Sequence, residues 1–262
     1  MIKMSGLYLD PSYSTALARF NATRNWSVFK NVHMAVSKHK CPICECALDG
    51  TVIRTSNNNS NTTLVATIDH YRPKDLHLYP NLQFDHENYI LMCSDCNNAY
   101  KGNQFPLHSS TPIRNILATS TRAITNELPL IVNPIFDNIF DLFKIVLKYT
   151  TSGKKVLELE AHSTDPYLKE KAEETIRLFS LGNCEDASHS HSSVNVQNCR
   201  ITLLNHHFTK FHTITSIMKG RQIIDLSEIE QRQVFIEVRN FKLMDYGFYD
   251  FIINGNYKNL VS

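Results

Sequence analysis

Cys41-Pro42-Ile43-Cys44 and Cys93-Ser94-Asp95-Cys96 are two C-x-x-C pairs, and the dipeptide Asp69-His70 lies between them. Each pair places two thiols on one tight turn, so the two pairs together can complete a tetrahedral zinc site. The 48 residues between the pairs are more than a simple zinc ribbon holds, which predicts a module of its own. Because such a unit has little apolar core, zinc binding is expected to stabilise its fold.

The cysteines allow two other interpretations. Four buried thiols in an apolar core would not need the same spacing in both pairs, and a redox C-x-x-C would need only one pair. Cys46 lies close enough to Cys44 to compete with it as a ligand, and its role stays open. With Cys184 and Cys199 the chain has seven cysteines, an odd count that is unusual for a secreted disulfide framework. Reduced thiols that hold zinc in a cytoplasmic protein are therefore predicted.

The composition is that of a globular protein with one large domain or two small ones, since 42% of the 262 residues are hydrophobic and 20% are charged. No run of 18 apolar residues occurs, and the first eleven residues lack a signal-peptide pattern, so neither membrane insertion nor secretion is expected. The net charge of +2 says little about partners. One stretch without acidic residues carries five basic ones, which form either a phosphate-binding face or an ordinary solvated helix face: Arg19, Arg24, Lys30, Lys38 and Lys40.

Hydrophobic patterning divides the chain into three regions of an α+β fold, at 1–39, 40–108 and 109–262. In the first region, the spacing of Trp26, Phe29 and Val36 predicts one amphipathic helix within residues 12–39, ending before Lys38. The second region is predicted to run as a strand at 64–69, a loop at 78–87, a strand at 89–92 and a helix at 94–101, which Gly102 ends. A segment at 49–63, rich in Asn, Ser and Thr, is predicted to be a flexible insertion.

The third region is predicted to be a β-hairpin followed mainly by helices, and to bind a partner protein. Strands at 143–150 and 155–160 flank a turn at 151–154. Asp165-Pro166 opens a helix that runs to about Leu181, where Gly182 stops it. A surface loop is expected at 188–193, and two further helices at 194–219 and 227–244.

Asp69 and His70 are predicted to lie at a strand end, where neighbouring side chains point to opposite sides. Asp69 and Asn97 offer oxygen ligands for a hard divalent ion such as Mg²⁺ or Mn²⁺. His70, whose ordinary pKa is near neutrality, suits the abstraction of a proton from an attacking water. The ion would stabilise charge on a phosphate and its leaving oxygen. These residue types in this order indicate a nuclease.

Three basic residues near these groups are candidates for contacts with nucleic-acid phosphates: Arg72, Lys74 and Lys101. Lys101 shares a helix face with Asn97, which lies four positions earlier. The other two lie two and four positions after His70, and they can equally pair with Asp75 or Asp85. Both possibilities stay open at the level of sequence.

In this order the motif resembles the HNH, or ββα-metal, nuclease superfamily, whose zinc-clamped members carry two C-x-x-C pairs. The resemblance implies a zinc-stabilised ββα core at residues 40–108, with His70 as the general base. It also implies that Asp69 and Asn97 bind the catalytic metal and that Asn88 braces the loop carrying the His. Many members have His-His in place of Asp69-His70 and a last His in place of Asn97, although both variants occur in the superfamily.

A narrower resemblance, over about residues 30–182, is to the retron-associated and Septu-type HNH proteins of bacterial antiphage defence. It is carried by the run at 69–74, by Asn88, by the second C-x-x-C with its following Asn, and by the segments at 130–138 and 175–182. It implies a cytoplasmic bacterial nuclease effector that accompanies an ABC-type ATPase. A retron reverse transcriptase with its RNA/DNA product is a further implied partner.

Two alternatives to a DNA-cutting enzyme remain. A ββα-metal site acts on the phosphate, and no base-reading motif is visible, so RNA, including tRNA, is a possible substrate. The other alternative is a zinc-stabilised module that binds nucleic acid or protein without catalysis, which would make Asp69, His70 and Asn97 incidental.

Overall fold

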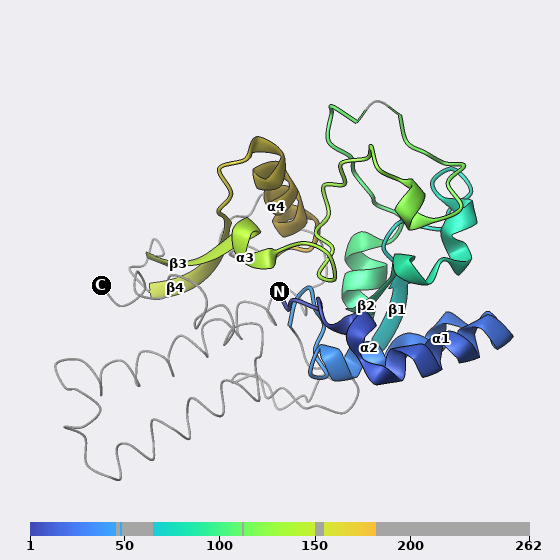
Figure 1. The fold of residues 1–262 in the computed structure, drawn as a ribbon. Coiled ribbons are helices and arrows are strands. Elements are labelled where there is room, and N and C mark those ends of the chain that lie inside the picture. Colours follow the sequence, from blue (N-terminus) through green and yellow to red (C-terminus); the bar gives the residue numbers. More distant parts are fainter. Residues whose placement is uncertain (46–47, 49–64, 112, 150–154, 182–262) are drawn as a thin grey trace, which may run out of the picture.

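The computed structural model describes residues 1–45, 48, 65–111, 113–149 and 155–181. This part has a mixed α+β architecture, as the sequence predicts, with helices and two separate two-stranded antiparallel sheets (Figure 1). The predicted insertion at 49–63, the loop at 188–193 and the helices at 194–219 and 227–244 lie outside the described residues. Within the described ranges, no helix combines the length and apolar character needed to cross a membrane.

The N-terminal segment is helical, as predicted, and its predicted amphipathic helix ending before Lys38 is confirmed, but a separate helix precedes it. After the short turn η1 (Leu7–Leu9), α1 (Pro11–Thr23) is capped by the Asp10 carboxylate and ends at Arg24, whose φ of 53° is left-handed. A 3₁₀ turn, η2 (Trp26–Phe29), then leads into α2 (Lys30–Val36). The break between the helices comes from the left-handed backbone conformation of Arg24. The spacing of the apolar residues does not reveal it.

The central module follows the predicted order of strand, loop, strand and helix. β1 (Ala66–His70) pairs antiparallel with β2 (Tyr89–Cys93), and His70 lies opposite Tyr89. The loop between them contains the 3₁₀ turns η3 (Pro80–Phe84) and η4 (His86–Asn88). The predicted helix is the π-helix η5 (Asp95–Lys101), which ends at Gly102 with a φ of 46°. That positive φ is a conformation that glycine adopts without steric cost.

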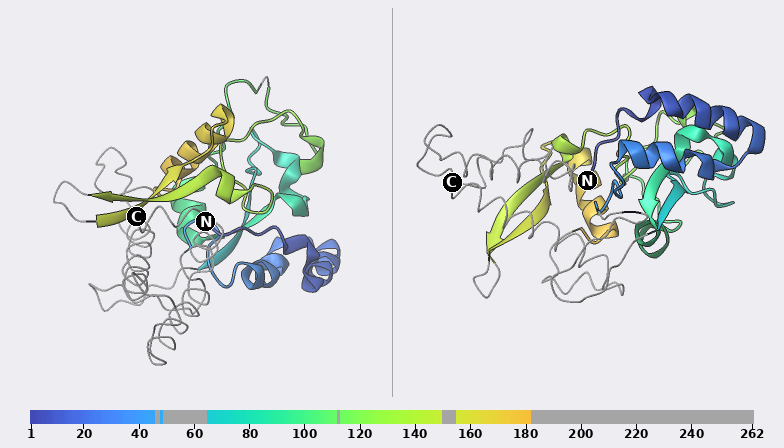
Figure 2. Two further views of the ribbon diagram at one scale, coloured as in Figure 1. Left: turned by 60° about the vertical axis from the view of Figure 1, so that its left-hand side comes forward. Right: turned by 90° about the horizontal axis from the view of Figure 1, so that it is seen from below.

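The predicted hairpin and its following helix are confirmed. A short 3₁₀ turn, η6 (Thr121–Ala123), and helix α3 (Ile139–Leu142) precede β3 (Phe143–Tyr149), which pairs antiparallel with β4 (Lys155–Ala161). Helix α4 (Pro166–Leu178) starts at the Asp165 cap and ends three residues before Leu181, because Ser180 takes a left-handed φ of 48°. The hairpin extends away from β1 and β2, with α4 beside it (Figure 2).

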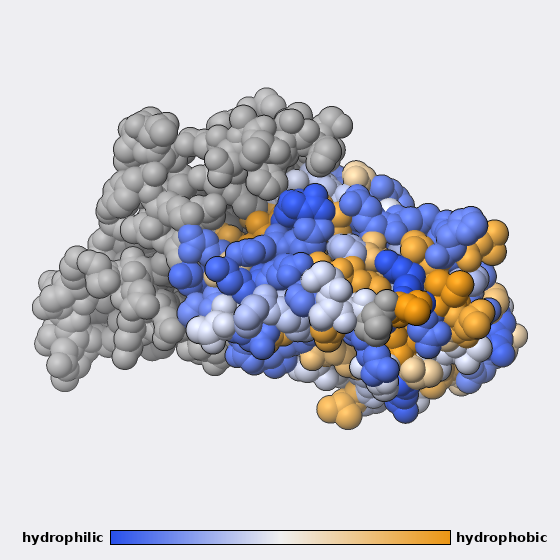
Figure 3. Space-filling view, turned by 90° about the horizontal axis from the view of Figure 1, so that it is seen from above, coloured by the Kyte–Doolittle hydropathy of each residue, from blue (hydrophilic) through white to orange (hydrophobic). Residues whose placement is uncertain are grey.

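Strand β2 is the centre of the core, since all five of its residues are buried. Tyr89 packs with Phe20, Phe29 and Val32 of the N-terminal helices. The rest of the strand packs into a second cluster, which includes residues from α4. The end of β1 that carries Asp69 and His70 is therefore held on a strand pair anchored by both clusters. Several large hydrophobic side chains are exposed on the surface. Figure 3 shows one face of the molecule, on which hydrophobic residues lie among hydrophilic ones.

His33 on α2 is fully buried, and neither ring nitrogen has a hydrogen-bond partner among the described residues. Burial lowers the pKa of His33 from 6.5 to about 3. The unfolded chain takes up a proton below pH 6.5 while the folded protein does not, so stability is lost as the pH falls through that value. Lowering the pH from 7.5 to 5.5 is expected to cost about 1.4 kcal/mol through this group.

Urea unfolding of the parent and of His33→Leu at both pH values measures this cost, with metal content determined in each sample. The variant is expected to lose about 1.4 kcal/mol less than the parent between the two pH values. His77→Leu, at an exposed position, is the matched control and should follow the parent. Equal losses in the parent and in His33→Leu would refute the assignment.

Candidate functional site

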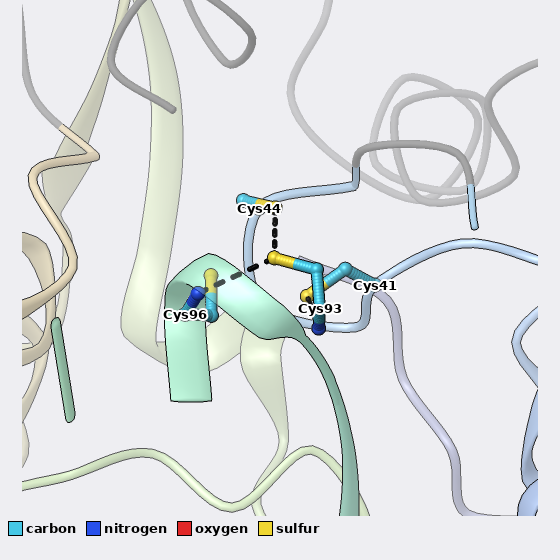
Figure 4. Close-up of side chains that lie close together, drawn as sticks. All are labelled: Cys41, Cys44, Cys93 and Cys96. Carbon is cyan, nitrogen blue, oxygen red and sulfur yellow. Dashed lines mark hydrogen bonds between the residues drawn. The ribbon is translucent and has the colours of Figure 1, made fainter. Parts of the chain in front are cut away.

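The four cysteines of the C-x-x-C pairs meet in one buried cluster. Cys41 and Cys44 come from the loop after α2, Cys93 ends β2, and Cys96 lies in the first turn of η5 (Figure 4). Their sulfur atoms all lie within 4.8 Å of one another, and the Cys44 and Cys93 sulfurs are 3.7 Å apart. A tetrahedral zinc site with Zn–S bonds of about 2.3 Å has sulfur–sulfur edges of about 3.8 Å. The cluster can therefore bind a structural metal such as zinc.

The hydrogen bonds to the sulfur atoms, and the charge that four buried thiolates would carry, also indicate a metal-binding cluster. The backbone N–H of Cys93 donates to the Cys41 sulfur, and that of Cys96 donates to the Cys93 sulfur, both at 3.3 Å. Hydrogen bonding to Cys41 raises the pKa of Cys93 and of Cys96, and burial adds to the shift. Four thiolates cannot share this buried space without a cation, which a divalent metal supplies.

The Asp69 carboxylate faces the buried ammonium group of Lys101. Lys101 Nζ lies 2.7 Å from Asp69 Oδ2 and donates a hydrogen bond of 2.8 Å to the His70 carbonyl oxygen. The contact with Asp69 is an ion pair without hydrogen-bond alignment, since Oδ2 has no hydrogen-bond partner within the described part of the chain. The Lys101 side chain has no exposed surface, whereas 14% of the Asp69 side chain is exposed. Lys101 therefore ties the last turn of η5 to the end of β1.

His70 is oriented by a backbone carbonyl. Its Nε2 atom lies 2.9 Å from the Gln83 carbonyl oxygen, which can only accept, so Nε2 carries the proton. Nδ1 is then the nitrogen with a free lone pair, and no residue of the described ranges donates to it. Burial lowers the pKa of His70 below 6.5, while the Gln83 hydrogen bond and Asp69 act in the opposite direction. A neutral imidazole with this tautomer is ready to accept a proton at Nδ1.

Asn88 holds the segment that follows His70. Its Nδ2 donates to the Arg72 carbonyl oxygen and its Oδ1 accepts from the Arg72 backbone N–H, both at 2.8 Å. Its own carbonyl oxygen accepts from the Tyr71 N–H at 2.7 Å. Asn88 is completely buried, so these bonds fix the backbone directly after the His.

Asn97 lies on η5, facing β1. Its Nδ2 donates to the Thr67 hydroxyl at 3.1 Å, which leaves Oδ1 as the acceptor atom of the amide. Thr67 and Asp69 are two positions apart on β1 and share one face of the strand. The Asp69 carboxylate and the Asn97 amide are therefore on the same side of β1, and both carry oxygen atoms of the type that hard divalent ions take as ligands.

Arg72 and Lys101 are internal residues, which corrects the expectation that they contact phosphate directly. Arg72 is 5% exposed, and its guanidinium pairs with Glu127 at 3.3 Å and lies over the Phe105 ring. Lys101 is engaged with Asp69 as described above. Of the three predicted phosphate contacts only Lys74 is exposed, and its ammonium lies 4.3 Å from the centre of the Trp26 ring.

Trp26 and Gln83 also contact His70, which no sequence pattern indicated. The Trp26 ring meets the His70 ring edge-on, with centroids 5.2 Å apart. Gln83 contributes only its backbone carbonyl, which no side-chain pattern can reveal. Comparison of the chain with known protein families, with curated proteins and with solved structures found no match.

Proposed function

We propose that this chain is a metal-dependent endonuclease of the HNH, or ββα-metal, type that hydrolyses phosphodiester bonds in nucleic acid, with DNA as the favoured substrate. The observation that carries the proposal is the orientation of His70. Its protonated Nε2 is held by a backbone carbonyl, and its free Nδ1 lies on a residue adjacent to the Asp69 carboxylate. A buried neutral His, with one ring nitrogen fixed by a carbonyl and a free lone pair on the other, is the arrangement that general-base chemistry needs.

Each residue of the proposed site has one task. His70 accepts a proton from water at Nδ1, and the Gln83 carbonyl stabilises the charge that forms on the ring. Asp69 and Asn97 would hold Mg²⁺ or Mn²⁺, which supplies positive charge to the phosphate when bound. Asn88 positions the backbone behind the His. Lys101 holds Asp69 in place. The four clustered cysteines would hold structural zinc.

The cellular role follows from the resemblance over residues 30–182. We infer a cytoplasmic effector of bacterial antiphage defence that works with an ABC-type ATPase and, in a retron, with a reverse transcriptase and its RNA/DNA product. Recovery of an ATPase subunit on purification of the chain from its native operon tests this role. Purification of the chain without such a subunit would count against it.

A zinc-stabilised binding module without catalysis is the second candidate. It is favoured by the internal partners of the metal-ligand residues, since Asp69 is paired with Lys101 and the Asn97 amide donates to Thr67. It predicts that an Asp69→Ala, Asn97→Ala double variant functions like the parent. The nuclease proposal predicts that this variant loses cleavage.

The deciding experiment compares the parent with His70→Ala on single-stranded DNA, duplex DNA and RNA, with added Mg²⁺ or Mn²⁺ and with and without the ATPase. Loss of the general base is expected to reduce the cleavage rate by about 10²–10⁴-fold. The zinc content should be unchanged, because His70 lies outside the cysteine cluster. His77→Ala is the matched control and should cut like the parent. Unchanged cutting by His70→Ala would remove His70 from the mechanism.

A further inference from the structure

An aromatic and cationic surface lies directly beside His70. Trp26, partly exposed on η2, contacts the His70 ring at 5.2 Å with an interplanar angle of 74°. Phe84, at the end of η3, is 45% exposed, and its ring centroid is 6.5 Å from that of Trp26. The exposed Lys74 places its ammonium 4.3 Å from the centre of the Trp26 ring. We call these three residues the Trp26 surface.

Basic residues lie on both sides of Trp26 along the chain. No Asp or Glu occurs between Asp10 and Glu45, and this interval carries five Lys and Arg residues. Arg19 and Arg24 are exposed, on α1 and at its C-terminal cap. The fold packs η2 against β1, so Trp26, which lies within this basic segment, contacts His70. A polyanion held by the basic segment would be guided toward the His.

We propose that the Trp26 surface stacks an unpaired nucleobase next to the scissile phosphate, so that the substrate class is single-stranded or locally unpaired nucleic acid. This inference rests on the proposed nuclease function. Bases in a duplex have both faces covered by their neighbours, whereas an unpaired base offers a free face to an aromatic ring. A partly exposed Trp with an exposed Phe beside it is a platform for such a base.

Lys74 adds a contact with phosphate to the stacking platform. A cation–π contact at an exposed site is weaker than the stacking of a base on an aromatic ring, so an arriving base displaces the ammonium from Trp26. The displaced ammonium is then near the phosphate of the same nucleotide, where opposite charge holds it. Because the Trp26 ring touches His70, the stacked base and the proton-accepting nitrogen are neighbours. The occupant is therefore a nucleotide whose phosphate is presented to His70.

Trp26 is the only tryptophan of the 262 residues, so its fluorescence reports this surface alone. A single-stranded DNA oligonucleotide added to the purified full chain, without Mg²⁺ or Mn²⁺, is expected to quench the emission as bases stack on the ring. An abasic chain of the same length should bind without quenching, and a blunt duplex should leave the emission unchanged. Equal quenching by the abasic chain or by the duplex would overturn the proposal. So would the absence of quenching by the single strand, which would leave the surface to a protein partner.

Variants separate stacking from phosphate contact. In fluorescence anisotropy with labelled single-stranded DNA, Trp26→Leu is expected to weaken binding about tenfold, because an apolar side chain cannot stack. Lys74→Gln should reduce the slope of log K against log salt by about 0.7, as loss of one phosphate contact on a single strand does. Phe136→Leu, at an exposed aromatic residue that contacts Tyr8, is the matched control and should bind like the parent. Parent-like affinity of Trp26→Leu, or an unchanged salt slope of Lys74→Gln, would refute the corresponding contact.

The two proposals fail in different ways. Cleavage that His70→Ala abolishes, combined with unchanged Trp26 emission on adding single strands, would keep the nuclease and refute the platform. Quenching by single strands, without cleavage under any metal condition, would keep the platform as a binding surface and refute the nuclease.

Discussion

Replacing Cys93 by Ser is expected to abolish metal binding at the four-cysteine cluster and to unfold the β1–β2 module. Cys93 is completely buried, and its sulfur accepts from the Cys96 N–H while its own N–H donates to the Cys41 sulfur. Structural zinc contributes about 10–16 kcal/mol to the folding of zinc-finger peptides. A domain of this size has a net stability of about 5–15 kcal/mol, so loss of the metal outweighs what the remaining core supplies.

Zinc per chain, measured by atomic absorption, and thermal unfolding followed by circular dichroism test this expectation. The parent should carry one zinc ion, and Cys93→Ser should carry none and show no cooperative transition. Cys184→Ser is the matched control, because it removes a thiol that belongs to neither C-x-x-C pair. A Cys93→Ser protein with full zinc and the parent's transition would show that the cluster is an ordinary packed core.

Replacing Lys101 by Met is expected to destabilise the protein by about 3 kcal/mol, the lower end of the range for a broken buried ion pair. Met retains the apolar stem of the lysine but leaves Asp69 with an unpaired charge and the His70 carbonyl without its donor. The lower end applies because water still reaches part of the Asp69 carboxylate. Chemical denaturation of the zinc-loaded proteins measures the change.

A double-mutant cycle identifies the cause. Asp69→Asn removes the unpaired charge, so the Lys101→Met, Asp69→Asn protein should regain most of the stability lost by Lys101→Met alone. Arg177→Met, which breaks an exposed ion pair with Glu174, is the matched control and should cost less than about 1 kcal/mol. Additive losses in the double variant would mean that Lys101 acts through packing alone.

Much of the central module could be predicted from the sequence, because local signals specify it. The apolar run before Asp69, the run after Asn88 and the glycine after Lys101 each mark one element, and β1, β2 and η5 follow them. The break between α1 and the helix that follows it was not predicted, for a local reason. Arg24 adopts a left-handed conformation that its residue type does not signal, and no apolar residue is displaced by the break.

The surroundings of the candidate site were less predictable. Arg72 and Lys101 carry charges that favour the surface when only sequence is considered. The fold supplies each of them with a carboxylate from a distant part of the chain, the buried Glu127 for Arg72 and the partly exposed Asp69 for Lys101. Burial of a charge depends on such a partner, and the partner's position is a property of the whole fold.

The sequence by itself determined which four cysteines can bind a metal together, the order of the central elements and the residue types available for chemistry, because spacing along the chain carries this information. Only the tertiary structure decided how those residues are used. In the folded chain, His70 Nε2 donates to the Gln83 carbonyl oxygen, the buried Lys101 ammonium pairs with Asp69, and the Trp26 ring contacts His70. These contacts join segments that are far apart in the sequence, and their formation depends on the packing of two core clusters around β2.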